Sequence, residues 1–543
     1  MTPEPLRLTE SPNVDGAFPR LDERRLTQLQ AVGQPRPVQA GDVLYHAGDI
    51  TSDFLVIVHG LVVVRDEDDR VVGVHGPGRF LGELSLLTGG PSLVSAVVAE
   101  AGTVLAVPVG KVHDLVAHDP DFGDMILRAC LQRRSVLIGL GTGPRILGSR
   151  FSADTRRLRD FVSRNRIPHR FIDLDRDDEA EALVRTLAIP PQQLPVVIWG
   201  VHTVMRNPSN AEVAQLLGLR SPKPAHDLVD LLVVGAGPAG LAAAVYCASE
   251  GLSTVVWEAV AAGGQAGTST RIENYLGFPA GISGAELAER ARVQADRFGA
   301  AITVPAVAAN LDGGPGHYII TAEDGENVQA RSVILAGGAR YRRLNLADLK
   351  PFEATSVYYT ATPFEAQLCV KTPVAVIGGG NSAGQAAMFL AQTAERVHLI
   401  VREDSLDVNM SRYLADRVAH TPTIQVHTHT TLAGAAGDHE LQTVTVSRNG
   451  TQQSLPASAL FVFIGADPNT TWLAGAVGLD PHGFVRTGEP AFAQDAGNGR
   501  RPFLLETDRP AVFAVGDLRR GATRRIASAV GDGAMAARFV HEL

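Results

Sequence analysis

The chain has 543 residues, of which 45% are hydrophobic and 20% are charged, and its formal net charge is −9 at pH 7. This length predicts three or four domains, and the acidic balance argues against nucleic acid as a partner. No apolar run reaches the roughly 18 residues of a membrane span, and the start MTPEPLRLTE lacks the features of a secretory signal, so we expect a cytoplasmic protein.

Three sections of the chain differ in pattern. Residues 1–138 contain apolar runs with glycine punctuation, such as DFLVIVHGLVVV, LVSAVVA and VLAVPV, which predict a β-rich domain that ends in a helix over 120–138. Residues 139–221 predict strand 145–149, helix 153–165, strand 169–175, helix 177–188, strand 194–199 and helix 210–218. The stretch SPKPAHD predicts a linker, and the alternation of strands and helices from residue 228 onward predicts parallel sheets.

The cysteines and histidines of the chain do not form metal-binding patterns. The three cysteines, Cys130, Cys247 and Cys369, lie far apart, and none belongs to a CxxC pair. This count fits a reducing compartment and predicts neither a disulfide framework nor a metal site. The histidines also lack metal-ligand spacing, so we predict no bound metal.

The strongest motif is LVDLLVVGAGPAGLAAAVYCASEGLSTVVWE at 228–258. An apolar strand leads into Gly235-x-Gly237-x-x-Gly240, a helix follows, and a second strand ends at Glu258. Glycines at these positions permit a tight turn and the approach of backbone amides to a pyrophosphate, and the acid is placed to accept ribose hydroxyls. The motif therefore predicts a dinucleotide site.

The next segment, GGQAGTSTRIENYLGFP at 263–279, favours FAD over NAD in this first site. It offers a second glycine loop at Gly264, an amide side chain at Gln265, and Asn274. These groups suit a long ligand that runs past the first strand.

A second fingerprint follows in TPVAVIGGGNSAGQAAMFLAQTAERVHLIVRE at 372–403. Its loop is Gly378-x-Gly380-x-x-Ala383, and its second strand runs to Arg402 rather than to an acid. An arginine there pairs with a 2′-phosphate, which favours NADP(H). Glu403 places a negative charge beside the same pocket, so NAD(H) stays open as an alternative.

Residues 228–543 resemble the low-molecular-weight thioredoxin reductase family, because GAGPAG, GGQ, ENYLGFP, ILAGGA, VIGGGNSA, LFVFIGADPNT, VFAVGD and RRIASAVGDGAMAA occur in the family's order. The resemblance implies an FAD-binding domain in two parts, 222–343 and 467–543, with an NAD(P)H-binding domain at 344–466 inserted between them. It implies further cofactor contacts at Pro238, Ala239, Val307, Ala336, Gly337, Asn381, Ser382, Ile464, Gly465, Gly516, Asp517, Arg525, Ile526 and Ala527. It also implies a homodimer.

The chain departs from this family where the redox-active CxxC belongs. The corresponding residues are Thr360-Ala361-Thr362-Pro363, and only a thiolate performs disulfide exchange. Tyr358 and Tyr359 precede this segment, and two alternatives are open for them: one tyrosine shields the flavin, or both pack against a strand edge.

Residues 139–221 resemble a thioredoxin or glutaredoxin fold, in which Pro195 takes the place of the family's cis-proline. The CxxC of that fold would fall at Ser152-Ala153-Asp154-Thr155, so both sulfur positions are again absent. The module is interpreted as a scaffold or docking surface, and the alternative is that Ser152 and Pro195 line a groove for a partner protein.

Residues 1–138 resemble the cyclic-nucleotide-binding β-barrel, with FLGELSLL and Pro91 as the matching core. The resemblance implies that Glu83 would hold a ribose hydroxyl. The family arginine that clamps the cyclic phosphate is replaced by Ser92, and losing this charge-assisted contact argues against cyclic-nucleotide binding unless Arg79 supplies the charge. A ligand-free regulatory or dimerising barrel is favoured.

In fold class the chain is therefore predicted to be multidomain: a β-barrel, an α/β thioredoxin-like fold and two Rossmann-like α/β dinucleotide-binding domains. The predicted function is that of an FAD-dependent NAD(P)H oxidoreductase that passes electrons from the flavin directly to an external small-molecule or protein acceptor, with the barrel as a regulatory domain. Two alternatives stay open: a non-catalytic flavin-bound redox or nucleotide sensor, and a thioredoxin-disulfide reductase that uses thiols of a partner chain. No catalytic residue is predicted.

Overall fold

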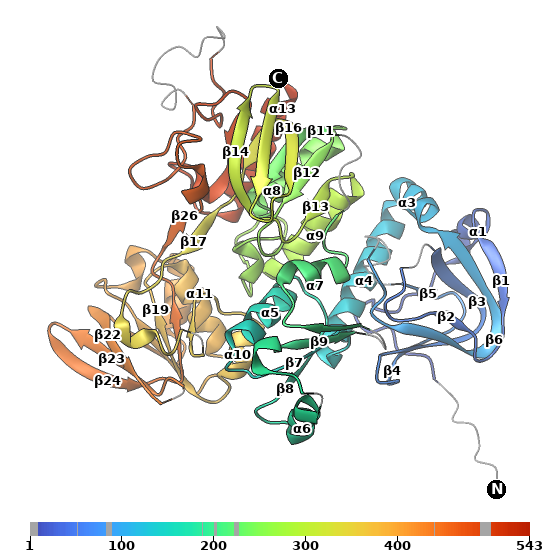
Figure 1. Cartoon of the computed structure of the whole chain (residues 1–543), viewed down its shortest axis with the longest axis horizontal. Helices are drawn as coiled ribbons and strands as arrows, with labels where there is room; N and C mark the ends of the chain where they lie inside the picture. The colour runs from blue at the N-terminus through green and yellow to red at the C-terminus, as the bar shows by residue number, and fades with distance from the viewer. Residues whose placement is uncertain are drawn as a thin grey trace. The chain divides into compact units, whose positions relative to one another are not determined.

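The computed structural model describes residues 9–50, 53–82, 90–186, 188–199, 203–221, 227–353, 355–438, 440–488 and 501–543. The chain divides into two compact units, Met1–Leu219 and Arg220–Leu543 (Figure 1). None of the helices in these ranges combines the length and the apolar character that a bilayer-spanning helix requires.

The first unit begins with an antiparallel sheet of six strands. They are β1 (Gln34–Val38), β2 (Val43–Tyr45), β3 (Asp53–Arg65), β4 (Val71–His75), β5 (Phe80–Leu81) and β6 (Ser95–Pro108), with the order β1-β6-β3-β4, β2 beside β6 and β5 beside β3. The predicted runs LVSAVVA and VLAVPV both belong to β6. The rings of Phe54 and Phe80 stack in the core of this sheet with their centroids 5.0 Å apart.

Within the described residues, the helices of this part of the chain are α1 (Glu23–Gln30), α3 (Val109–His118) and α4 (Pro120–Leu140). The predicted helix 120–138 is thus present as α4. It begins there because the Asp119 side chain accepts a hydrogen bond from the Phe122 amide and Pro120 occupies the first turn, and it ends at Gly141 in the left-handed region with φ 62°.

The first unit continues with a mixed sheet in the order β10-β9-β7-β8. Its strands are β7 (Arg145–Gly148), β8 (Arg170–Asp173), β9 (Val196–Trp199) and β10 (Thr203–Arg206), and its helices are α5 (Ala153–Arg164), α6 (Asp178–Thr186) and α7 (Asn210–Leu216). Strands β7 and β8 are parallel, whereas β9 runs antiparallel to both β7 and β10. The predicted helices and strands of this section are confirmed, and β10 is an additional strand that the sequence analysis missed.

The second unit contains a seven-stranded sheet in the order β13-β12-β11-β16-β15-β14, with β27 also paired to β16. These strands are β11 (Leu228–Val234), β12 (Thr254–Trp257), β13 (Ala301–Thr303), β14 (Ala308–Gly314), β15 (His317–Ala322), β16 (Asn327–Leu335) and β27 (Val512–Ala514). The pairings among β13, β12, β11, β16 and β27 are parallel, as predicted, whereas β14 and β15 form an antiparallel extension.

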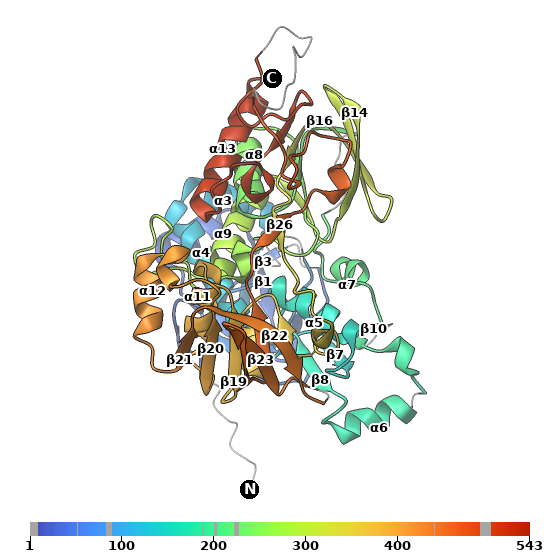
Figure 2. The same cartoon turned by 90° about the vertical axis from the view of Figure 1, so that its left-hand side faces the viewer.

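The helices associated with this sheet are α8 (Pro238–Ser249), α9 (Gly284–Arg297) and α13 (Ile526–His541). Helices α8 and α13 lie side by side in both views (Figures 1 and 2). Small residues permit this close approach, because a Cβ atom on Gly533 would lie 2.1 Å from the Ala239 carbonyl oxygen. The last helix of the chain is thereby fixed against the first helix of the unit.

A second parallel sheet is inserted after β16, with the order β18-β25-β19-β20-β21. Its strands are β18 (Val357–Tyr358), β19 (Pro373–Ile377), β20 (Arg396–Ile400), β21 (Ile424–His427) and β25 (Ala459–Val462), and its helices are α10 (Pro363–Leu368), α11 (Asn381–Leu390) and α12 (Arg412–Ala419). An antiparallel sheet of β22 (Thr430–Ala436), β23 (Thr443–Arg448) and β24 (Thr451–Pro456) accompanies it.

The chain enters and leaves this inserted region through two short strands. Strand β17 (Ala339–Tyr341) leads out of the first parallel sheet, β26 (Ala466–Pro468) leads back, and the two pair antiparallel. The first parallel sheet therefore receives its last strand, β27, only after the chain has formed the second parallel sheet.

Candidate active site

The first glycine loop joins β11 to α8 and has no room for side chains at two of its three glycines. Gly235 has φ 110°, and a Cβ on it would lie 2.4 Å from the Ala336 carbonyl oxygen. A Cβ on Gly240 would lie 1.8 Å from the Gly235 carbonyl oxygen, whereas one on Gly237 would meet no heavy atom within 4 Å. The loop is therefore tight on the protein side and open at Gly237, where α8 begins with Pro238 in its first turn.

A second loop, Gly263-Gly264-Gln265, lies against the first. The Gly263 amide donates to the Ala236 carbonyl oxygen at 2.7 Å, and a Cβ on Gly264 would lie 3.1 Å from the Gly237 Cα. The Gln265 amide nitrogen donates to the Ala339 carbonyl oxygen at 3.3 Å, whereas its Oε1 is buried without a hydrogen-bond partner among the described residues. An orphaned acceptor beside a phosphate-type loop is what a site built for a bound dinucleotide presents.

Glu258 follows β12 and is 8% exposed. Its carboxylate accepts hydrogen bonds from the backbone amides of Ala236 at 2.7 Å, Val260 at 2.9 Å and Ala261 at 3.3 Å. Because these donors belong to the glycine loop and to the turn after β12, the predicted acid lies against the loop, where the motif requires it.

The turn after β27 approaches the start of α8. Gly516 has φ 69°, and a Cβ on it would lie 3.1 Å from the Ala239 Cβ. Its amide donates to Asp532 Oδ2 at 3.1 Å, and Arg519 pairs with the same oxygen at 3.2 Å. Burial raises the pKa of Asp517 above its ordinary value. Asp532 belongs to the motif RRIASAVGDGAMAA, but the motif alone predicts no role for this residue.

The other predicted FAD contacts differ in whether a hydrogen bond connects them to the elements around this loop. The Ala336 amide donates to the Val234 carbonyl oxygen at 2.8 Å, and Gly337 accepts a hydrogen bond from the Asn469 side chain at 3.0 Å. The Arg525–Ala527 segment forms the start of α13, with Arg525 as its N-cap residue. Among the described residues, no hydrogen bond joins Asn274 or Val307 to the glycine loop.

The second glycine loop joins β19 to α11. Gly378 has φ 138°, and a Cβ on it would lie 2.3 Å from the Phe463 carbonyl oxygen, which brings the predicted residues Ile464 and Gly465 beside the loop. Gly380 is the N-cap residue of α11, which begins with Asn381 and Ser382, and Ala383 is fully buried. The Asn381 side-chain oxygen accepts a hydrogen bond from the Ser411 amide at 2.7 Å.

Arg402 and Glu403 form an ion pair at this second loop. Arg402 Nε lies 2.9 Å from Glu403 Oε1, and the two side chains are 81% and 18% exposed. This hydrogen bond holds the pKa of Glu403 below its ordinary value, so the carboxylate is ionised at neutral pH. The sequence predicts both charges here but not their pairing.

The segment 357–366 forms a strand end and a helix start. The backbone amide of Thr362 donates to Glu365 Oε2 at 2.7 Å, and the Thr362 hydroxyl donates to the same oxygen. This arrangement matches one half of a capping box, with Pro363 in the first turn of α10. The residues that replace the expected CxxC therefore stabilise the start of a helix.

The two tyrosines of this segment use their hydroxyl groups within their own domain. The Tyr358 hydroxyl donates to the Thr355 carbonyl oxygen at 2.7 Å, and its ring lies 5.3 Å from that of Phe461. The Tyr359 hydroxyl donates to Glu353 at 3.4 Å. Of the two alternatives for these tyrosines, the contacts favour packing.

The three cysteines of the chain are buried and form no disulfide with one another. Burial raises the pKa of Cys247 and that of Cys369 to about 12, with smaller contributions from Glu250 and Glu365. A thiol with such a pKa is almost entirely protonated at neutral pH, and thiol–disulfide exchange requires the thiolate. Neither of these thiols is prepared for redox chemistry.

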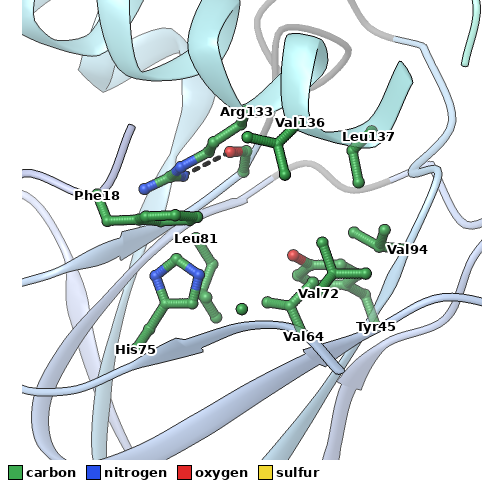
Figure 3. A pocket seen from close by; sticks show the side chains of 12 residues that line it. Phe18, Tyr45, Val64, Val72, His75, Leu81, Val94, Arg133, Val136 and Leu137 are labelled. Carbon is green, nitrogen blue, oxygen red and sulfur yellow. Dashed lines mark hydrogen bonds between the residues drawn. The ribbon is translucent and has the colours of Figure 1, made fainter. Parts of the chain in front are cut away.

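A cavity of about 40 Å³ lies between the N-terminal sheet and α4 (Figure 3). Its wall is mainly apolar, with His75 and Arg133 as the ionisable members. Arg133 donates to the carbonyl oxygens of Ala17, Phe80 and Gly82 at 2.8, 3.1 and 2.7 Å. Burial, with Arg133 nearby, lowers the pKa of His75 well below its ordinary value. The guanidinium therefore ties α4 to the sheet, and the imidazole is neutral.

The cations expected at a cyclic-phosphate site are absent or occupied in the described part of this sheet. Ser92 is 7% exposed, and its hydroxyl donates to the Val94 carbonyl oxygen at 2.9 Å. Arg79 lies 3.3 Å from Glu10 Oε2. Glu83, the expected ribose contact, lies outside the described residues.

In the second sheet of the first unit, the residues expected at the missing CxxC adjoin the expected proline. The Ser152 hydroxyl caps α5 and accepts a hydrogen bond from the Thr155 amide at 3.4 Å. A Cβ on Gly148 would lie 2.4 Å from Thr155 Oγ1 and 3.1 Å from Pro195, and the Leu194–Pro195 peptide is cis. The side chains at this position are those of a helix cap.

Comparisons with known proteins agree with this arrangement of loops and sheets. Residues 229–533 match the family of pyridine nucleotide-disulphide oxidoreductases, and residues 35–119 match the cyclic nucleotide-binding domain. The chain is 32% identical over 359 residues to NADPH-dependent thioredoxin reductase 3 of Arabidopsis thaliana, which covers 62% of this chain and 64% of that protein. It is 33% identical over 330 residues to the thioredoxin reductase of Eremothecium gossypii, which covers 57% of this chain and 98% of the relative.

Two solved structures are similar in fold. The thioredoxin reductase of Lactococcus lactis superposes with a TM-score of 0.53 at 26% identity over 58% of this chain and 98% of that one. The thioredoxin reductase of T. acidophilum gives 0.52 at 27% identity over 58% of this chain and 99% of that one. The expected thioredoxin reductase-like section and the N-terminal cyclic nucleotide-binding domain are confirmed. The chain therefore belongs to the pyridine nucleotide-disulphide oxidoreductase family, and its second unit is an FAD-containing NAD(P)H oxidoreductase of the thioredoxin reductase type.

Proposed function

We propose that this protein passes electrons from NAD(P)H through FAD directly to an external acceptor, without an internal redox disulfide. The acceptor is a small molecule, such as a quinone or oxygen, or an electron-carrier protein. The chemistry that bound FAD supplies is the acceptance of a hydride from the nicotinamide and the release of electrons to an acceptor.

The observation that carries this proposal is the capping arrangement at Thr362 and Glu365. The resemblance places the family's dithiol in this segment. Here Thr362 instead donates two hydrogen bonds to one carboxylate oxygen of Glu365, at the start of a helix. The burial of Cys130, Cys247 and Cys369 supports the same conclusion, because no thiol of the chain is exposed to an acceptor.

The residues that serve the cofactors have separate roles in this proposal. The open backbone at Gly237 and the start of α8 would hold the FAD pyrophosphate, Glu258 would accept ribose hydroxyls, and Gln265 Oε1 would accept a hydrogen bond from the ligand. Gly380 and the start of α11 do the same for the nicotinamide dinucleotide. The protein thereby orients two rings and needs no acid, base or nucleophile of its own for the transfer.

Anaerobic stopped-flow absorption tests the proposal in two steps. Mixing the oxidised holoenzyme with NADPH or NADH is expected to bleach the flavin band near 450 nm. A second mixing, with menadione, ferricyanide or oxygen, is expected to restore this band. Failure of both nicotinamides to bleach the flavin would refute the enzyme function. Reoxidation that occurs only with a disulfide and a dithiol partner would instead favour the thioredoxin-reducing alternative.

We further propose the domain boundaries 1–138, 139–221, 222–343, 344–466 and 467–543, with the second domain as a thioredoxin-like scaffold. The strand order β10-β9-β7-β8 and the cis peptide at Pro195 support this assignment. Limited proteolysis followed by mass spectrometry is expected to cut first within 221–227. Primary cleavage inside the 144–220 region would contradict the assignment.

We propose that the N-terminal domain regulates the oxidoreductase without binding cyclic nucleotides. Two features support this: the buried Ser92 and the pairing of Arg79 with Glu10. Isothermal titration with cyclic AMP and cyclic GMP is expected to release no binding heat. Saturable binding of either nucleotide would overturn this part of the proposal.

A further inference from the structure

The two candidate dinucleotide sites of the second unit can be aligned by the backbone hydrogen bond that the first glycine of each loop donates to the neighbouring strand. In this alignment, the acidic residue of the second site lies at a different position from that of the first site. In the first site the Gly235 amide donates to the Trp257 carbonyl oxygen at 2.7 Å, and the next residue is Glu258. In the second site the Gly378 amide donates to the Ile400 carbonyl oxygen at 3.0 Å. The residue after Ile400 is Val401, which is fully buried, so the position of the ribose-binding acid is apolar here.

A carboxylate nevertheless faces the second glycine loop, from two residues further along the chain. A Cβ on Gly379 would lie 2.8 Å from Glu403 Oε2, so this oxygen lies against the backbone that approaches the dinucleotide. The Glu403 side chain is 18% exposed. The neighbouring Asp404 is 86% exposed and lies 3.4 Å from His429, away from this contact.

The same carboxylate holds the arginine that the 2′-phosphate of NADPH would need. Glu403 Oε1 accepts a hydrogen bond from Arg402 Nε at 2.9 Å and another from the Asn409 side chain at 3.3 Å. A phosphate that bound Arg402 would therefore compete with Glu403 for the guanidinium and would lie beside a second negative charge. NADH carries no such phosphate, and a carboxylate at this loop suits its ribose hydroxyls.

We propose that Glu403 sets the nicotinamide preference by restraining Arg402 and opposing the 2′-phosphate, so that the enzyme uses NADH and NADPH with comparable efficiency. The inference rests on the proposed function, since it concerns the electron donor of that reaction. It assigns Glu403 as a specificity-determining residue.

Steady-state kinetics with ferricyanide as the acceptor test the inference. For the wild-type holoenzyme, the kcat/KM values for NADPH and NADH are expected to agree within about tenfold. Glu403→Gln removes the charge but keeps the size, and it is expected to raise kcat/KM for NADPH about tenfold while changing that for NADH by less than about threefold. Most of the change is expected in KM, because uniform binding is altered rather than hydride transfer.

Two further variants separate this role from a general effect on charge. Asp404→Asn removes an adjacent acid that does not face the loop, and it is expected to leave the NADPH-to-NADH ratio within twofold of the wild type. In the Arg402→Ala background, Glu403→Gln is expected to lose most of its effect on NADPH, because the restrained cation is gone. Binding of 2′-phospho-ADP-ribose, measured by titration calorimetry, is expected to tighten in Glu403→Gln and gives a readout without turnover.

Either of two results would overturn the inference: an unchanged ratio in Glu403→Gln, or an equal shift in Asp404→Asn. A wild-type enzyme that prefers NADPH by more than about a hundredfold would also overturn it. If neither nicotinamide bleaches the flavin, the proposed function has failed. A normal bleach with an unchanged NADPH-to-NADH ratio shows that this inference alone has failed.

Discussion

The two dinucleotide sites share a loop geometry but hold their carboxylates in different ways. Glu258 is held by three backbone amides, which no substitution elsewhere can remove without moving the main chain. Glu403 is held by two side chains, those of Arg402 and Asn409, at the protein surface. A cofactor that stays bound, such as FAD, can be recognised by a carboxylate that the backbone holds in place. The choice between NADH and NADPH depends instead on side chains, which single mutations can change. The variants below separate the two sites.

The largest effect is expected from Gly240→Ala in the first site. The added Cβ would lie 1.8 Å from the Gly235 carbonyl oxygen, so the loop and α8 must separate. The variant is expected to purify without flavin, measured as the ratio of absorbance at 450 and 280 nm. Gly531→Ala in α13 is the control, because its Cβ would meet no atom within 4 Å, and it is expected to keep a full complement of flavin.

In the second site, Gly378→Ala is expected to abolish reduction by nicotinamides while the flavin stays bound. Its Cβ would lie 2.3 Å from the Phe463 carbonyl oxygen, and its φ of 138° is strained for any other residue. Stopped-flow traces are expected to show a rate lowered by more than about a hundredfold with either nicotinamide, while dithionite still reduces the flavin. Loss of the flavin as well would mean that the two sites do not fold independently.

A smaller effect is expected from Glu258→Ala. Three backbone amides would lose their charged acceptor. If water replaces part of these hydrogen bonds, the free energy of unfolding is expected to fall by about 3 kcal/mol. Urea denaturation followed by flavin fluorescence measures this cost. The equivalent Glu403→Ala is expected to change the unfolding free energy by less than about 1 kcal/mol, since its partners reach water. Equal costs would remove the distinction between the two carboxylates.

The smallest effect, none at all, is expected when the native enzyme is treated with iodoacetamide. All three cysteines are buried, and burial raises the pKa of Cys247 and of Cys369 to about 12, so these two thiols are almost entirely protonated at pH 8. Alkylation requires both access to the thiol and its thiolate form. Turnover with ferricyanide is expected to stay unchanged, and mass spectrometry is expected to find three modified cysteines only after denaturation. Inactivation of the folded enzyme would place a reactive thiol in the electron path of one of the sites.

The features that sequence alone could predict are those determined by neighbouring residues in the chain. Both glycine loops, the helices α8 and α11 and the place of Glu258 follow from short motifs whose spacing fixes their geometry. The contact of Glu403 with Gly379 did not follow, because it depends on how the turn after β20 bends back. The hydrogen bond from the Gly516 amide to Asp532 joins two segments through the packing of α13, which no local pattern reveals.

Two strands, β6 and β10, show the same limit. Residues 100–103 interrupt the apolar pattern of the N-terminal domain with polar and exposed positions, yet β6 continues through them because β3 pairs with it across irregular register shifts near His59. Strand β10 has an alternating pattern only four residues long, and its pairing with β9 makes it a strand. In both cases a distant strand, rather than the local sequence, determines the structure.

The pairing of β17 with β26 shows how the region between these two strands is inserted into the chain. Tyr341 and Ala466, where the chain departs and returns, are direct partners across this ribbon. A segment whose two ends meet in this way can be gained or lost by a gene without stretching the host fold. Joining Tyr341 to Ala466 by a tight turn would close this ribbon as a hairpin, so the shortened polypeptide can test whether the first parallel sheet of the unit forms without the inserted region.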